Sequence, residues 1–191
     1  MRKVVFDIET KNSFAEINST DPTAFDISVV AIYDSETDDY SVFEEHEFSK
    51  LWSILEKTDL LIGFNSDHFD IPILNKYYPG DLTVIKSLDI LKEIKAQYGR
   101  RMKLDQLADG TLGMSKSGNG LDAIRWWRNG EKDKVKKYCI DDVKITKEIY
   151  DFAIKNGSLK FREGGTVQEV KLSTTHWEEI PHASMTHTLP F

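Results

Sequence analysis

The 191-residue sequence has one cysteine and no long apolar run, and each absence excludes a class of protein. Because Cys139 is alone, an internal disulfide and a zinc site built from several thiolates are excluded. Cys139 lies among apolar neighbours in a helical stretch, so we expect it to be a small buried hydrophobic residue. No apolar run approaches the roughly 20 residues of a membrane-spanning helix, and the N-terminus enters a short β-like run instead of a signal peptide. We therefore expect a cytoplasmic globular domain that does not engage membranes.

Positive charge is also in deficit, since the net charge is −7. The deficit is uneven along the chain. Residues 1–90 carry 7 Lys or Arg against 18 Asp or Glu, whereas residues 91–150 carry 14 against 9. This division suits a site in which carboxylates bind cations while basic side chains meet phosphates. Solvated helix faces would explain any single lysine equally well.

Strand patterns dominate the first half of the chain. Short runs rich in β-branched residues predict buried strands at residues 3–10 and 60–65. Residues 27–33 and 40–43 flank an acidic turn and predict a hairpin, and a weaker strand signal covers residues 82–88. Interleaved with helices, these strands predict an α/β domain.

Helical patterns follow the strands. Ser49 is expected to cap a helix that ends near residue 56, and a second helix is expected over residues 69–78. The longest helix should cover residues 132–155 and end at Gly157.

The C-terminal segment has a different character. Residues 159–172 surround Gly164-Gly165 and predict a hairpin, and the polar tail from residue 173 is expected to be loosely held. We therefore divide the chain into a domain at residues 1–157 and a C-terminal hairpin with a polar tail at residues 158–191.

Two carboxylates interrupt the first predicted strand. Asp7 and Glu9 are two residues apart, so their side chains point to the same face of the sheet. A triplet of this kind also arises by chance in an acidic chain, where it would be a polar strand end. Two carboxylates in an otherwise apolar strand are costly without a cation, which makes this pair a candidate for metal binding.

Two further aspartates lie on predicted helices. Asp70 stands near a helix N-terminus, which by itself favours an anion, so capping is an alternative for which Asp67 is the better candidate. Tyr138 and Asp142 are four residues apart and share a helix face. The alternative for this pair is a buried tyrosine beside a surface aspartate.

Together these residues resemble the DEDD superfamily of 3′–5′ exonucleases in its tyrosine branch. Residues 7–10 resemble its first motif, residues 65–70 its second and residues 138–142 its third. The histidine branch would require a histidine where this chain has Lys137. The second and third motifs are similar to those of the proofreading domains of B-family DNA polymerases and their free-standing relatives.

The resemblance implies a ribonuclease H-like fold, with helices flanking a central mixed five-stranded sheet and the hairpin as an appendage. It also implies hydrolysis of single-stranded nucleic acid, DNA in preference to RNA, from the 3′ end with two Mg²⁺ or Mn²⁺ ions. Carboxylate oxygens are the ligands that such hard cations prefer. By resemblance, Asp7 bridges the two ions, and Glu9 and Asp142 complete the ligands of one ion. Asp70 supports the other ion, and Tyr138 orients the attacking water.

Substrate contacts are expected from residues around the carboxylates. By resemblance, Thr10, Asn65 and Phe69 lie near the terminal nucleotide, although Phe69 could equally serve only in packing. The basic candidates for following the nucleic-acid backbone are Arg100, Arg101, Lys103, Lys116, Arg125 and Arg128. Adjacent helical residues cannot face the same way, so one of Trp126 and Trp127 is expected in the core, and Trp126 is the candidate for stacking on substrate. The five histidines show no spacing typical of metal ligands.

Two other functions remain open. One is a ribonuclease H-like endonuclease, against which the helix of Tyr138 and Asp142 argues. The other is a catalytically silent module that binds nucleic acid or docks a partner. The expected partner is a polymerase or a helicase, and the expected process is DNA repair.

Overall fold

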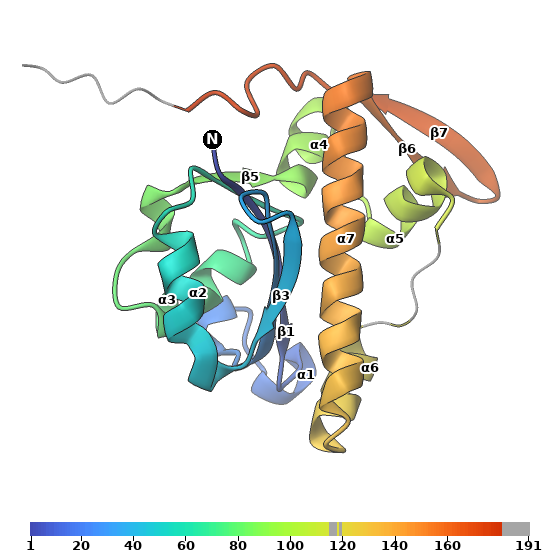
Figure 1. The fold of residues 1–191 in the computed structure, drawn as a ribbon. Helices are drawn as coiled ribbons and strands as arrows, with labels where there is room; N and C mark the ends of the chain where they lie inside the picture. Colours follow the sequence, from blue (N-terminus) through green and yellow to red (C-terminus); the bar gives the residue numbers. More distant parts are fainter. Residues whose placement is uncertain (115–117, 119, 181–191) are drawn as a thin grey trace, which may run out of the picture.

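Strand β1 runs through the middle of the sheet in the computed structural model, which describes residues 1–114, 118 and 120–180 (Figure 1). The strands are β1 (Lys3–Thr10), β2 (Ile27–Asp34), β3 (Asp39–Phe43), β4 (Leu60–Gly63) and β5 (Lys86–Asp89). Their order is β3-β2-β1-β4-β5, with β1, β4 and β5 parallel and the β1–β2 and β2–β3 pairs antiparallel. The expected mixed five-stranded sheet is confirmed. Because β1, β4 and β5 are parallel, the segments that follow them all begin at the same end of the sheet, where these strands end.

Helices cover both faces of this sheet. On one face α2 (Phe48–Leu55) and α3 (Asp70–Tyr77) enclose a core with the even-numbered apolar residues of β1. On the other face the long helix α7 (Lys132–Asn156) packs on β1 and β2. The remaining helices are α1 (Phe14–Ile17), α4 (Ile90–Tyr98), α5 (Leu104–Leu107) and α6 (Gly120–Arg128), with a π-helical turn at Ala108–Leu112 and 3-10 turns at Pro22–Ala24, Glu45–Glu47 and Leu82–Val84.

Most expected elements are present, with three local differences. Helix α2 begins at Phe48 with Glu47 at its N-cap, so the expected cap at Ser49 is wrong. The weak strand expected over residues 82–88 is divided, because a 3-10 turn precedes the four-residue strand β5. Asp67 does not cap α3, since its carboxylate accepts hydrogen bonds from Ser87 Oγ and Lys92 Nζ, both at 2.6 Å.

Helix α7 ends where the sequence predicts. Gly157 follows its last residue with φ of 62°, a left-handed conformation that glycine adopts without steric cost. Val135, Cys139 and Val143 recur every fourth residue and are fully buried, which confirms the expected burial of the cysteine. The neighbouring face of α7 carries Tyr138 and Asp142, so the same helix packs on the sheet and presents polar groups beside it.

The C-terminal hairpin is formed by β6 (Ser158–Glu163) and β7 (Thr166–Lys171). Its inward side chains, among them Leu159 and Phe161, are fully buried in the same core as α7. The expected boundary after residue 157 falls at the C-cap of α7 and stays a prediction.

The polar composition of the tail predicts loose attachment, and for residues 173–180 this is wrong. Trp177 is fully buried, stacks on Tyr150 with ring centroids 6.2 Å apart and donates from Nε1 to Glu93 at 3.1 Å. The adjacent Glu178 pairs with Lys3 at 2.7 Å. One large aromatic ring in a polar segment is sufficient to anchor it. The rest of the expected tail lies outside the described residues, as do His182 and His187.

None of the described helices is both long enough and apolar enough to cross a membrane.

Gly110 tests how firmly the hairpin is joined to the domain. A Cβ atom added at Gly110 would lie 2.4 Å from Cα of Phe161, and backbone cannot give way as a flexible side chain would. We expect Gly110→Ala to lower the free energy of unfolding by about 1–3 kcal/mol or more. The control is Gly120→Ala, because a Cβ at Gly120 meets no atom within 4 Å and should change stability by less than about 0.5 kcal/mol. Denaturant unfolding of both variants checks this, and equal stabilities would contradict the close packing at Gly110.

Candidate active site

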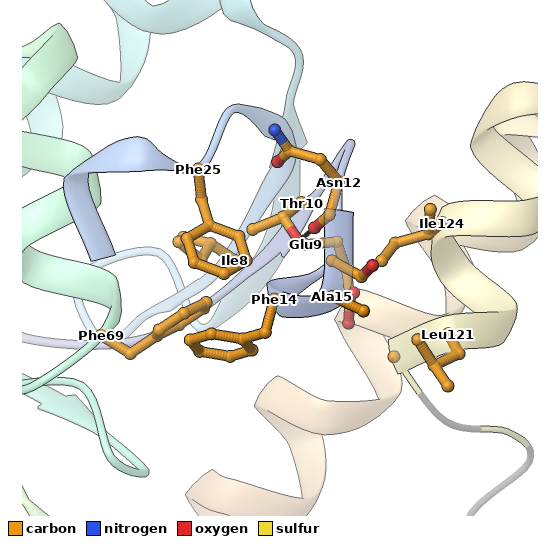
Figure 2. Close-up of a pocket in the computed structure, with 12 residues that line it drawn as sticks. Ile8, Glu9, Thr10, Asn12, Phe14, Ala15, Phe25, Phe69, Leu121 and Ile124 are labelled. Atoms are coloured by element: carbon orange, nitrogen blue, oxygen red, sulfur yellow. Dashed lines mark hydrogen bonds between the residues drawn. The ribbon is translucent and has the colours of Figure 1, made fainter. Parts of the chain in front are cut away.

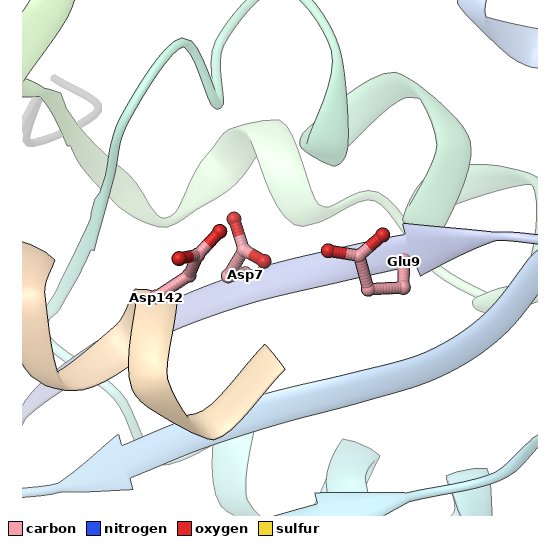
Figure 3. A group of neighbouring side chains, drawn as sticks. All are labelled: Asp7, Glu9 and Asp142. Carbon is pink, nitrogen blue, oxygen red and sulfur yellow. The ribbon is translucent and has the colours of Figure 1, made fainter. Parts of the chain in front are cut away.

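Strand β1 and helix α7 bring three carboxylates together. Asp7 and Glu9 project from the same face of β1, and Asp142 projects from α7 towards Asp7 (Figure 3). Each residue offers one oxygen, and these oxygens all lie within 4.8 Å of one another. The sequence places Asp7 and Glu9 on one face by strand alternation, and the packing of α7 on β1 adds Asp142.

The cluster has the chemistry of a site for a hard divalent cation. Glu9 and Asp142 are 8% and 5% exposed, so little water is available to separate their charges from that of half-buried Asp7. Like charges this close repel one another, and a bound cation would reverse the sign of the interaction. An all-oxygen donor set fits Mg²⁺ or Mn²⁺ better than zinc.

Asp70 lies beside this cluster but outside the group of three. It is the first residue of α3, and its Oδ1 accepts a hydrogen bond at 3.2 Å from the backbone N–H of Ile8, the residue between Asp7 and Glu9. Burial and the charge of nearby Asp89 together raise the pKa of Asp70 to about 7, despite the hydrogen bond from Ile8. Asp70 is therefore close to β1 and costly to ionise without a cation.

Asp89 is a site residue that the sequence reasoning missed. It ends β5 and caps α4, accepting hydrogen bonds from the backbone N–H groups of Leu91 at 3.0 Å and Lys92 at 3.2 Å. The same carboxylate accepts from the backbone N–H of Asn65 at 2.8 Å, which fixes the loop that leads to Asp70. An aspartate between a strand and an apolar helical repeat is the usual N-cap signal, so its capping role could have been predicted. Its contact with Asn65 could not, because it depends on β4 pairing with β5.

Tyr138 is buried next to the carboxylates. Its side chain is 3% exposed, and its ring meets Trp126 edge to face with centroids 6.1 Å apart. Burial raises the pKa of the phenol well above its usual value of about 10, and the negative charges of Asp142, Glu9 and Asp7 add to the shift. The phenol therefore keeps its proton and can donate a hydrogen bond.

A pocket of about 640 Å³ opens beside the cluster, with Glu9 and Thr10 in its wall. The rings of Phe14, Phe25 and Phe69 gather on one side of it, and Leu121 and Ile124 of α6 lie opposite (Figure 2). Phe14 and Leu121 are 54% and 69% exposed, so apolar surface faces this opening.

The polar residues expected at the substrate differ in their positions. The Thr10 hydroxyl donates to the carbonyl of Asn12 at 2.9 Å, so its Oγ is already engaged. Asn65 does not line the pocket; its Oδ1 accepts from Arg101 at 2.6 Å on the neighbouring surface, in a left-handed backbone conformation with φ of 66°. Lys116 lies outside the described residues.

The other expected basic candidates are mostly held in ion pairs. Arg100 pairs with Glu163 at 2.7 Å, Arg125 with Asp122 at 2.9 Å and Arg128 with Glu16 at 2.7 Å, while Lys103 is exposed. Arg100 thus binds the hairpin, a contact that no local pattern could predict.

The two adjacent tryptophans do not divide into one core and one surface residue as expected, since both are half-buried. Trp126 faces Tyr138, whereas Trp127 lies under the ammonium groups of Lys11 and Lys132, 5.9 and 4.7 Å from its ring centroid. Adjacent residues of a helix point about 100° apart, and of these two only Trp126 points towards the candidate site.

Comparison with known proteins gives a family and a fold. The family model of the RNase_H superfamily matches residues 4–154. No curated protein sequence matches the chain. The solved structures include a family B DNA polymerase from the hyperthermophilic archaeon Pyrobaculum calidifontis, with a TM-score of 0.60, 20% identity and coverage of 81% of this chain and 24% of that one. A structure of exonuclease I has a TM-score of 0.55, 15% identity and coverage of 81% and 41%. The chain spans less than half of either protein, and these identities establish a shared fold.

The raised pKa of Asp70 predicts that removing its carboxylate increases the free energy of unfolding at high pH. An unfolded aspartate has a pKa of about 3.9, so the folded protein resists ionising Asp70 and loses stability as the pH rises from about 4 to 7. Asp70→Asn keeps an oxygen that can accept from Ile8 but carries no charge. With cations chelated, it should be more stable than the parent by about 1–3 kcal/mol at pH 8 and equally stable near pH 4. Denaturant unfolding at both pH values checks this; a variant no more stable than the parent at pH 8 would contradict it.

Proposed function

This chain belongs to the RNase_H superfamily, and we propose that it is a metal-dependent 3′–5′ exonuclease acting on single-stranded nucleic acid, with DNA preferred. The observation that carries this proposal is the convergence of Asp7, Glu9 and Asp142 within 4.8 Å beside a pocket open to solvent. The likeness in fold to a DNA polymerase and to exonuclease I supports it by analogy.

The carboxylates have distinct roles in this proposal. Asp7 would serve as a ligand to both cations, Glu9 and Asp142 would complete the ligands of one, and Asp70 would support the other. Bound Mg²⁺ or Mn²⁺ would offset the charge of the phosphodiester, acidify a water molecule and stabilise the leaving 3′-oxygen. The cost of ionising Asp70 in the metal-free protein is consistent with a carboxylate that becomes charged only when a cation is near.

Tyr138 supplies a neutral hydrogen-bond donor at the same place. Its raised pKa keeps the phenol protonated at physiological pH, so it orients the attacking water and does not act as a base. The edge contact with Trp126 and the burial of the ring limit the directions in which its hydroxyl can point. Proton removal is left to the carboxylates and solvent.

The pocket beside Glu9 is the place for the terminal nucleotide. Its wall is mostly apolar, and Phe14 and Leu121 expose surface on which any base can stack. Stacking recognises the faces of a base but not its edge, so we expect little preference among the four bases. Arg101, bound to Asn65 on the adjoining surface, is placed to meet a phosphate of the same strand.

The direction of digestion is the first test of this function. Because the pocket takes a chain end, a single DNA strand carrying a 3′-phosphate should be degraded at least about tenfold more slowly than one with a 3′-hydroxyl. A 5′-phosphate serves as the matched control and should have no effect. End-labelled strands with Mg²⁺ or Mn²⁺, and matched RNA strands, give the rates. Rapid cutting of a circular single strand would contradict the proposal and favour an endonuclease, and no cutting at all would favour a silent binding module.

Tyr138 and Asp142 should differ in how much turnover depends on them. Tyr138→Phe removes one hydroxyl and keeps the ring, so we expect a fall of about 10- to 100-fold with unchanged substrate affinity. Asp142→Asn removes a cation ligand and should cost about 10³-fold or more. Single-turnover cleavage at saturating Mg²⁺ gives the rates, and binding in Ca²⁺ gives the affinities. A Tyr138→Phe enzyme whose cleavage rate is within about twofold of the parent's, well short of the expected loss, would show that the phenol hydroxyl has no role in the reaction.

A further inference from the structure

Cys139 occupies the point at which the packing face of α7 adjoins the candidate site. Val135, Cys139 and Val143 form one row along the helix, and all three are fully buried against the sheet. The flanking positions show that an apolar side chain of similar size satisfies the packing of this row. Compared with valine, cysteine adds a group that can donate a hydrogen bond.

The thiol makes two contacts with Asp7. Cys139 Sγ lies 3.4 Å from the backbone carbonyl oxygen of Asp7 and 3.6 Å from its carboxylate Oδ2. Asp7 pairs with Ala31 across β1 and β2. The sulfur therefore packs on the sheet at the position from which the Asp7 side chain projects. A thiol donates its hydrogen, and both oxygens of Asp7 that it approaches are acceptors.

We propose that Cys139 is a positioning residue, whose thiol hydrogen bond holds the Asp7 carboxylate in the orientation that receives a divalent cation. This inference rests on the proposed function. Asp7, Glu9 and Asp142 each bring one oxygen within 4.8 Å of the others, so the orientation of the half-buried Asp7 carboxylate decides whether a cation can bind all three. A donor at Oδ2 limits rotation of the Asp7 carboxylate about its Cβ–Cγ bond.

The size of the residue matters as well as its proton. Asp142 reaches the cluster only because α7 lies close to β1, and the buried side chain at position 139 sets part of that separation. Groups that orient metal ligands in this way commonly change metal affinity by about tenfold or more when they are removed. The role of Cys139 should therefore be visible in cation binding.

Cation binding to the purified parent protein and three variants tests the proposal. Calorimetric titration with Mn²⁺ compares the parent with Cys139→Ser, which keeps a donor, and with Cys139→Ala and Cys139→Val, which do not. We expect Mn²⁺ affinity within about twofold of the parent for the serine variant and about 3- to 10-fold weaker for the other two. Turnover of Cys139→Ala at saturating Mn²⁺ should recover to within a few-fold of the parent, because the site is restored once cations fill it.

Ile149→Val is the matched control for packing. Ile149 is fully buried on α7, two helical turns beyond Asp142, and this change also shortens a core side chain. It should lower stability slightly and leave Mn²⁺ affinity unchanged. If Cys139→Ala fails to fold, Cys139→Val still removes the donor while filling the space.

The outcomes separate the inference from the function on which it rests. Alanine and valine variants that bind Mn²⁺ as tightly as the parent would overturn the role of Cys139 and leave the proposed exonuclease intact. A serine variant as weak as the alanine variant would also overturn it, because the donor would then be irrelevant. A parent that binds no Mn²⁺ would overturn both proposals.

Discussion

The mutual repulsion of three carboxylates, held close together on the face of the sheet that α7 covers, governs the candidate site. Asp7, Glu9 and Asp142 are fixed by a strand and a helix that cannot separate without exposing the core of the domain. The fold thus stabilises an arrangement that is unfavourable without a counter-charge. A site of this kind is preorganised, because binding a cation requires little movement of its ligands.

The topology explains why the polar groups lie at one end of the parallel strands. β1, β4 and β5 are parallel, so the segments after each of them start at the same end of the sheet. Glu9 lies near the end of β1, the loop to Asp70 follows β4, and Asp89 ends β5. Helix α7 then crosses β1 and supplies Tyr138 and Asp142 from a segment more than 120 residues away. Hydrogen bonds from backbone N–H groups to Asp70 and Asp89 connect these segments directly.

Local periodicity predicts the parts of this site that lie within single elements. Strand alternation places Asp7 beside Glu9, and helical spacing places Tyr138 beside Asp142, so both pairs could be predicted before any packing was known. The resemblance to the DEDD superfamily indicated that the two pairs belong to one site. Contacts set by tertiary packing were not predictable, because no sequence pattern pairs Arg100 with Glu163, Trp177 with Glu93 or Cys139 with Asp7. Arg100, Arg125 and Arg128 are exposed as well as ion-paired, so their expected contacts with a nucleic-acid backbone stay predictions.

The number of Mn²⁺ ions that the protein binds tests the proposed site for two cations. Electron paramagnetic resonance of a Mn²⁺ titration distinguishes isolated ions from a spin-coupled pair about 4 Å apart. We expect two coupled ions per chain for the parent protein and loss of the coupled pair in Asp7→Ala, because that residue would be shared by both ions. A parent protein that binds no Mn²⁺, or an Asp7→Ala variant with the same coupled signal, would contradict it.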